Sequence, residues 1–181
     1  MAIRMDYLSR LEEAKSMPDI FELVKSLVLK SMGKSRGGLM LGLANLGNNP
    51  QTFLGGFFAT GSNVIVLNRI PLQRIKETRP EIFKPYVFHV LLHEYIHSLG
   101  FLDEAEVRSR VLALSREALV RSRVLALSRE ALGEKHLATM MAEDCGGFIS
   151  YLAYPGLAWR GEDEKMELVE GFDRSSASYI A

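Results

Sequence analysis

Hydrophobic residues recur every three or four positions through the first thirty residues, which is the spacing of one face of an α-helix. Leu8 and Leu11 begin this face, and it continues beyond Pro18 with the apolar residues Ile20, Phe21, Val24, Leu27 and Val28. Pro18 or Asp19 is expected to open a second helix, because both suit a helix start. The pattern therefore predicts two helices within residues 6–32 that pack against a core.

Short apolar runs separated by turn residues follow, and they predict strands. The first run covers residues 39–43. Two further runs, 52–59 and 63–68, are joined tightly by Thr60-Gly61-Ser62 and predict a β-hairpin. Gly55 and Gly56 in its first strand indicate a bulge or a close approach of another part of the chain.

A helix over residues 70–78 comes next, and then an almost wholly apolar run over 86–100 that contains three of the four histidines. Pro85 suits the first turn of a helix and Gly100 suits the residue after its end, so the run is expected to form one complete helix. Glu94 is the one charged side chain within it. A lone carboxylate in an apolar helix indicates a specific role.

A perfect tandem duplication follows, in which residues 107–119 are repeated as 120–132. Thirteen residues at 100° each leave the second copy about 140° out of phase on a continuous helix. The apolar stripe of the first copy is Val107, Val111, Leu114 and Ala118, and that of the second is Val120, Val124, Leu127 and Ala131. One copy can pack on the core while the other lengthens the helix, loops out or supports self-association.

The remaining sequence predicts a helix over 135–154 and a polar C-terminal tail over 161–181, whose last segment, 172–180, is expected to be loosely docked. Together these elements predict one α+β domain spanning 1–181. Its upper lobe, 1–100, would hold the sheet and the apolar helix, and its helical lower lobe, 101–160, would hold the duplication.

Composition restricts the partners. Lys and Arg number 22 and Asp and Glu number 22, so net charge favours neither nucleic acid nor an anionic membrane. The arginines of the duplicated segment have no aromatic residues between them for base stacking, so a solvated face is expected there. The single cysteine, Cys145, excludes an internal disulfide. With no secretion signal and no apolar stretch that could span a bilayer, a cytoplasmic location is expected.

The chemistry of the apolar helix resides in His93-Glu94-x-x-His97. Residues i and i+4 lie one turn apart on the same face, so both imidazoles can reach one Zn²⁺ ion. Glu94 can then act as a base on a water at the open coordination position. His89 lies a further turn away and has rotated around the axis, so we expect it in the core or beside the ligands, not as a ligand.

The helix–strands–helix order and the extended motif, from His93 to Asp103, resemble the zincin metallopeptidases and, within them, the metzincin pattern H-E-x-x-H-x-x-G-x-x-[H or D]. The resemblance implies a zincin-like fold and hydrolysis of peptide bonds in a peptide or protein substrate. It also implies that Gly100 turns the chain so that Asp103 becomes the third ligand. Met140 or Met141 could supply the methionine turn beneath the metal, but both fall in a helical context, so ordinary core packing is expected for them.

The residues alone do not decide which side chain is the third ligand. Asp103 is also well placed to cap a following helix, with Glu106 three residues later completing a capping box. A later carboxylate is the alternative, and the candidates are Glu104, Glu106 and Glu143, with His136 as a further possibility. The competing function is a non-catalytic helical interaction protein with a structural or vestigial metal site.

Overall fold

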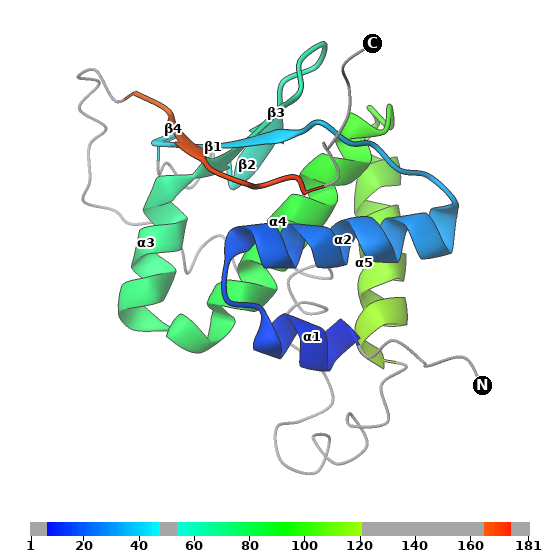
Figure 1. Ribbon diagram of the computed structural model, residues 1–181, viewed down its shortest axis with the longest axis horizontal. Coiled ribbons are helices and arrows are strands. Elements are labelled where there is room, and N and C mark those ends of the chain that lie inside the picture. Colours follow the sequence, from blue (N-terminus) through cyan, green and yellow to red (C-terminus); the bar gives the residue numbers. More distant parts are fainter. Residues whose placement is uncertain (1–6, 48–53, 121–164, 175–181) are drawn as a thin grey trace.

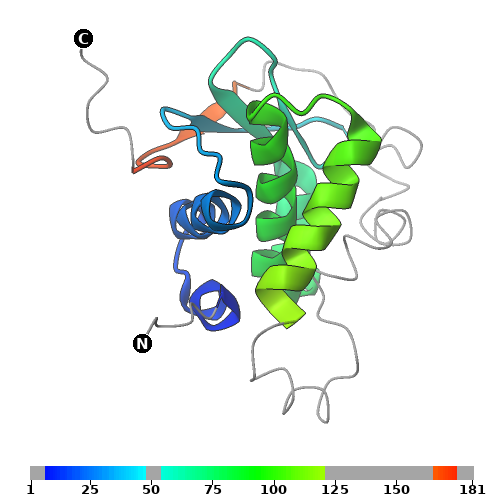
Figure 2. The same ribbon diagram turned by 90° about the vertical axis from the view of Figure 1, so that its right-hand side faces the viewer.

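The computed structural model describes residues 7–47, 54–120 and 165–174, and these form an α+β fold. Within them, five α-helices lie on one side of a small mixed sheet of four strands (Figure 1). Figure 2 shows α4 (Phe83–Ser98) running between α2 (Met17–Met32) and α5 (Glu104–Val120). The predicted α+β class is confirmed, and α4, which carries the histidines, is the central helix.

The first two helices are α1 (Tyr7–Glu13) and α2. Helix α2 begins slightly earlier than the sequence predicts. Its cap is Ser16, and Pro18 and Asp19 lie within its first turn. The Ser16 side chain accepts a hydrogen bond from the backbone N–H of Asp19, and the Asp19 carboxylate accepts one from the N–H of Lys15. This arrangement resembles a capping box, except that Asp19 accepts from the residue before the cap, and it leaves Pro18 inside the first helical turn.

The sheet has the strand order β2-β3-β1-β4. Strand β1 (Met40–Ala44) pairs in parallel with β3 (Val64–Asn68), and β2 (Gly56–Phe58) pairs with β3 as the predicted antiparallel hairpin. Gly56 makes the close approach that its sequence context indicates. A Cβ atom there would lie 2.8 Å from the carbonyl oxygen of Val66 and 3.0 Å from Val90 on α4. Glycine thus allows β2 to lie against the central helix.

Helix α3 (Arg69–Thr78) and a 3₁₀ turn (Pro80–Ile82) lead into α4. Most of α4 is buried, and its core side chains include Phe88, Leu91, Leu92, Tyr95 and Ile96. The chain leaves the helix through Leu99 and Gly100, whose φ of 96° lies in the left-handed region that glycine tolerates without a Cβ penalty.

Helix α5 contains the first copy of the duplicated segment. The stripe predicted from its spacing is buried against the core, with Val107, Val111, Leu114 and Ala118 each no more than 5% exposed. The described residues do not include most of the second copy or the expected helix over 135–154. The candidates Met140, Met141, Glu143 and His136 also lie outside them. No helix within 7–47, 54–120 or 165–174 is both long and apolar enough to cross a bilayer.

The prediction of a loosely docked last segment is wrong for residues 172–174, and the strand that precedes them in the tail was not predicted. Strand β4 (Glu167–Val169) pairs antiparallel with β1 and completes the sheet. Phe172, which is 2% exposed, stacks on Phe21 at a centroid distance of 4.0 Å. Three apolar residues among polar ones gave too weak a periodic pattern to predict a strand whose partner lies more than a hundred residues earlier.

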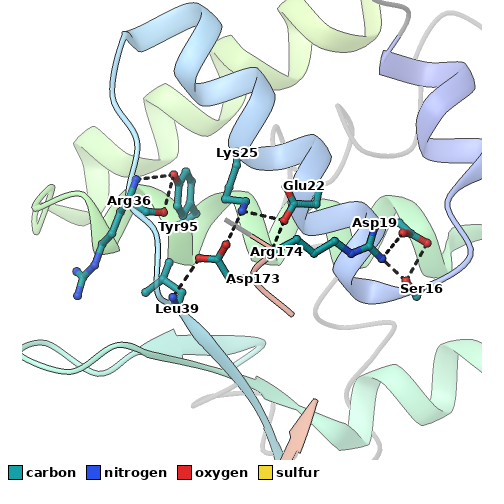
Figure 3. Close-up of polar contacts among 9 residues, drawn as sticks. All are labelled: Ser16, Asp19, Glu22, Lys25, Arg36, Leu39, Tyr95, Asp173 and Arg174. Atoms are coloured by element: carbon teal, nitrogen blue, oxygen red, sulfur yellow. Dashed lines mark hydrogen bonds and ion pairs between the residues drawn. The ribbon is translucent and has the colours of Figure 1, made fainter. Parts of the chain in front are cut away.

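A polar network holds this C-terminal segment against α2 (Figure 3). The Asp173 carboxylate accepts hydrogen bonds from Lys25 Nζ at 2.6 Å and from the Leu39 N–H at 3.1 Å. Burial alone lowers the pKa of Lys25, but the charges and hydrogen bonds of Asp173 and Glu22 outweigh it and raise that pKa above its ordinary value. Arg174 adds an ion pair to Asp19 at 2.7 Å.

Candidate metal centre

The two motif histidines meet on one face of α4, as the four-residue spacing requires. The distance from His93 Nε2 to His97 Nε2 is 3.1 Å, and both side chains are largely buried, at 18% and 13% exposed. Burial lowers the pKa of His93, although the Glu104 carboxylate opposes this effect. A lowered pKa favours the neutral imidazole, which is the form that binds a metal.

The backbone fixes the ring of His97. Its Nδ1 lies 2.8 Å from the carbonyl oxygen of Phe101, which can only accept, so Nδ1–H is the donor. In the neutral ring the lone pair then lies on Nε2, the atom that faces His93. The turn through Gly100 is what brings the Phe101 carbonyl back to the end of α4.

Glu104, the first residue of α5, supplies a carboxylate to the same point. Its Oε1 lies 3.0 Å from His97 Nε2 and its Oε2 lies 3.5 Å from His93 Nε2. Partial burial raises the pKa of Glu104, but the two histidines more than compensate and leave it below the ordinary value. His93, His97 and Glu104 form a group of three potential ligands within the described residues.

The separations within this group fit a zinc ion. In a tetrahedral site with bonds of about 2.0–2.1 Å, neighbouring ligand atoms lie about 3.3–3.4 Å apart. The two imidazole Nε2 atoms lie 3.1 Å apart, and the Glu104 carboxylate lies 3.0 Å from His97 Nε2 through Oε1 and 3.5 Å from His93 Nε2 through Oε2. Two imidazole nitrogens and one carboxylate oxygen are also a donor set that zinc accepts, the set found in catalytic sites with three protein ligands. The residues present therefore fit the metal that the motif predicts.

Glu94 lies on the same helix but is buried, with 6% of its surface exposed. Burial raises its pKa to about 8. A hydrogen bond from the Phe58 N–H lowers this pKa, and the nearby Glu104 charge raises it. Because the N–H of Ala59 bonds to the carbonyl of Val64 in the β2–β3 ladder, the N–H of Phe58 points away from β3. The outward edge of β2 thus holds the candidate base.

The other predicted candidates occupy different positions. Asp103 caps α5, since its Oδ1 accepts a hydrogen bond from the Glu106 N–H at 2.7 Å. The Glu106 carboxylate forms an ion pair with Arg110 at 2.6 Å. His89 is outside the group of three. Burial and the neighbouring His93 lower its pKa to about 4, and its Nδ1 has no hydrogen-bond partner among the described residues.

Two parts of this site could not be predicted from the sequence, the Phe58 N–H that bonds to Glu94 and the Phe101 carbonyl that bonds to His97. Both are backbone groups, which every residue carries, so no residue type marks them. The nearest sequence signals were the glycines beside them, Gly56 and Gly100.

Glu104 and Asp103 can be distinguished as the third ligand by a matched pair of amide substitutions. Substitutions beside a metal ligand cost about 10–100-fold in affinity, so we expect E104Q, which removes a direct ligand, to weaken zinc binding by more than about 100-fold. D103N should leave zinc affinity unchanged and the helix capped, because asparagine caps as well as aspartate. Competition with a chromophoric zinc chelator measures both, and the reverse order of affinities would assign Asp103 as the ligand.

Comparison of the chain with protein-family models, curated proteins and solved structures finds no match. The resemblance to zincin metallopeptidases is therefore still a prediction from the motif.

Proposed function

We propose that this protein is a zinc-dependent peptidase whose ligands are His93, His97 and Glu104 and whose base is Glu94. The single observation that supports this most strongly is the convergence of the three ligand side chains at separations of 3.0–3.5 Å, next to a buried glutamate on the same helix. Within the described residues the group offers three protein ligands, the number that catalytic zinc sites use, whereas structural zinc sites use four.

Zinc bound at this group would supply Lewis-acid polarisation of the scissile carbonyl and would lower the pKa of water. The Phe101 carbonyl keeps the His97 ring in one tautomer and orientation. The Phe58 N–H orients the Glu94 carboxylate, which takes the proton of the attacking water and gives it to the leaving amine.

A peptide is the favoured substrate because an edge strand borders the site. In the described sheet, β2 pairs with β3 on one side and has no strand on its other side. An extended peptide can pair with such an edge through main-chain hydrogen bonds, which bind many sequences alike. The Phe58 N–H places that edge directly at Glu94.

Zinc removal and restoration tests the proposal. Protein stripped with a chelator should cleave no member of a mixed peptide library, and one equivalent of Zn²⁺ should restore the cleavage, read as new termini by mass spectrometry. Magnesium is the control ion, since it prefers an all-oxygen set of ligands. If the protein binds one zinc tightly and still cleaves no peptide, the site is structural or vestigial. If chelation unfolds the protein, a structural metal is favoured.

A further inference from the structure

Arg36, in the loop between α2 and β1, contacts both of the elements that hold the candidate centre. Its Nη1 donates to the carbonyl of Ser98, the last residue of α4, at 2.6 Å. Its Nη2 donates to the carbonyl of Ser62, in the turn between β2 and β3, at 2.7 Å. One guanidinium therefore joins the end of the central helix to the hairpin.

The contact of Arg36 with the hairpin lies next to the candidate base, Glu94. The guanidinium carbon of Arg36 lies 5.0 Å from the ring centroid of Phe58, whose N–H holds Glu94. Strand β2 has three residues and pairs with one described neighbour, β3. A cation over the ring of its last residue and a hydrogen bond to the following turn restrain the C-terminal end of β2.

The contact of Arg36 with α4 lies next to the candidate ligand His97. The carbonyl of Ser98 belongs to the last turn of α4, where carbonyls lack partners within the helix and the helix dipole is negative. Ser98 follows His97 directly and precedes the turn through Gly100 that returns the Phe101 carbonyl to the His97 ring. A guanidinium at this carbonyl fixes the exit of the helix.

The backbone of Arg36 is itself anchored, so its side chain starts from a defined point. Its N–H donates to the Tyr95 hydroxyl at 2.9 Å, and that hydroxyl donates to its carbonyl at 3.3 Å. Tyr95 is fully buried and lies between Glu94 and His97 in the sequence. Figure 3 shows this contact, with the guanidinium extending away from Tyr95.

We propose that Arg36 is a positioning residue: it holds the β2–β3 hairpin against the C-terminal end of α4 and so sets Glu94 relative to His97. Only the planar fork of arginine can reach both carbonyls at once, so lysine is not an equivalent replacement. The kinetic consequence of this role rests on the proposed peptidase function, whereas its structural consequence at the Phe58 amide does not.

The test compares R36Q and R36K with R69Q as the matched control. Arg69 also donates to a backbone carbonyl, that of Leu43, and pairs with Glu167, but it lies beside β4. R36Q should speed hydrogen exchange of the Phe58 amide at least tenfold and lower kcat of the zinc-loaded enzyme about 10–100-fold, with KM within twofold of wild type. The Phe58 exchange rate and the kcat of R36K should fall between those of R36Q and wild type. R69Q should change none of these values.

The outcomes separate the two proposals. If R36Q and R36K lower thermal stability but leave Phe58 exchange and kcat as in wild type, Arg36 is merely structural and the inference is wrong. If wild-type protein cleaves no peptide, the peptidase proposal fails, and amide exchange at Phe58 still decides the role of Arg36. If R36Q does not fold, the same comparison is made with R36K, and wild-type values there would overturn the inference.

Discussion

Replacing Glu94 by glutamine should lower kcat for peptide hydrolysis about 10²–10⁴-fold, the range that a positioned general base contributes. Glutamine has nearly the same shape and its amide oxygen can still accept the Phe58 N–H, but it cannot take a proton from water. The ligands His93, His97 and Glu104 are untouched, so zinc affinity should not change. Progress curves on a quenched-fluorescence peptide, with zinc measured in the same sample, check both expectations.

E106Q is the matched control for E94Q. Glu106 is a glutamate at the start of α5 whose carboxylate bonds to Arg110 and not to the ligands. The E106Q variant should hydrolyse peptide at the wild-type rate. Equal activity of E94Q and wild type, with zinc bound in both, would remove Glu94 from the mechanism.

Asp173→Ala should destabilise the protein by about 3–5 kcal/mol, the cost of removing one partner from a buried ion pair. The side chains of Asp173 and Lys25 are 1% and 10% exposed, so little water can replace the lost contact. The substitution also leaves the N–H of Leu39 without the carboxylate that accepts it. Urea unfolding followed by circular dichroism measures the change in the free energy of unfolding.

Two further variants give this prediction its contrast. E167A, in the same segment, removes an ion pair to Arg69 whose carboxylate is 68% exposed, and should cost less than about 1 kcal/mol. The double variant K25M/D173L should recover much of the loss, because apolar residues can replace a buried pair. A loss in D173A no larger than in E167A would contradict the assigned role of the pair.

Local patterns were enough to predict most elements. The helical spacing of apolar residues predicted α2 and the buried stripe of α5, and Thr60-Gly61-Ser62 between apolar runs predicted the β2–β3 hairpin. The motif spacing predicted that His93 and His97 would share a helix face, which their 3.1 Å separation bears out. Each of these properties depends on residues within about two turns or one hairpin of each other.

Contacts between residues that are far apart in the chain could not be predicted from local sequence patterns. Strand β4 forms because β1 offers it an edge, and no local pattern encodes that partner. The third carboxylate was left open because Asp103 and Glu104 are neighbours, and the direction in which each points is set by how α5 begins. Asp103 caps the helix, and this places the side chain of Glu104 at the histidines.

The pairing of β4 with β1 also orders events during synthesis. Lys25 and Asp173 are separated by 148 positions, so at about 5–20 residues per second a ribosome delivers Asp173 roughly 7–30 s after Lys25. In that interval the nascent chain carries a β1 edge without β4, a Phe21 ring without Phe172 and Lys25 without the carboxylate of Asp173. The core beside α4 is therefore completed only by residues that are translated more than a hundred positions after α2 and β1.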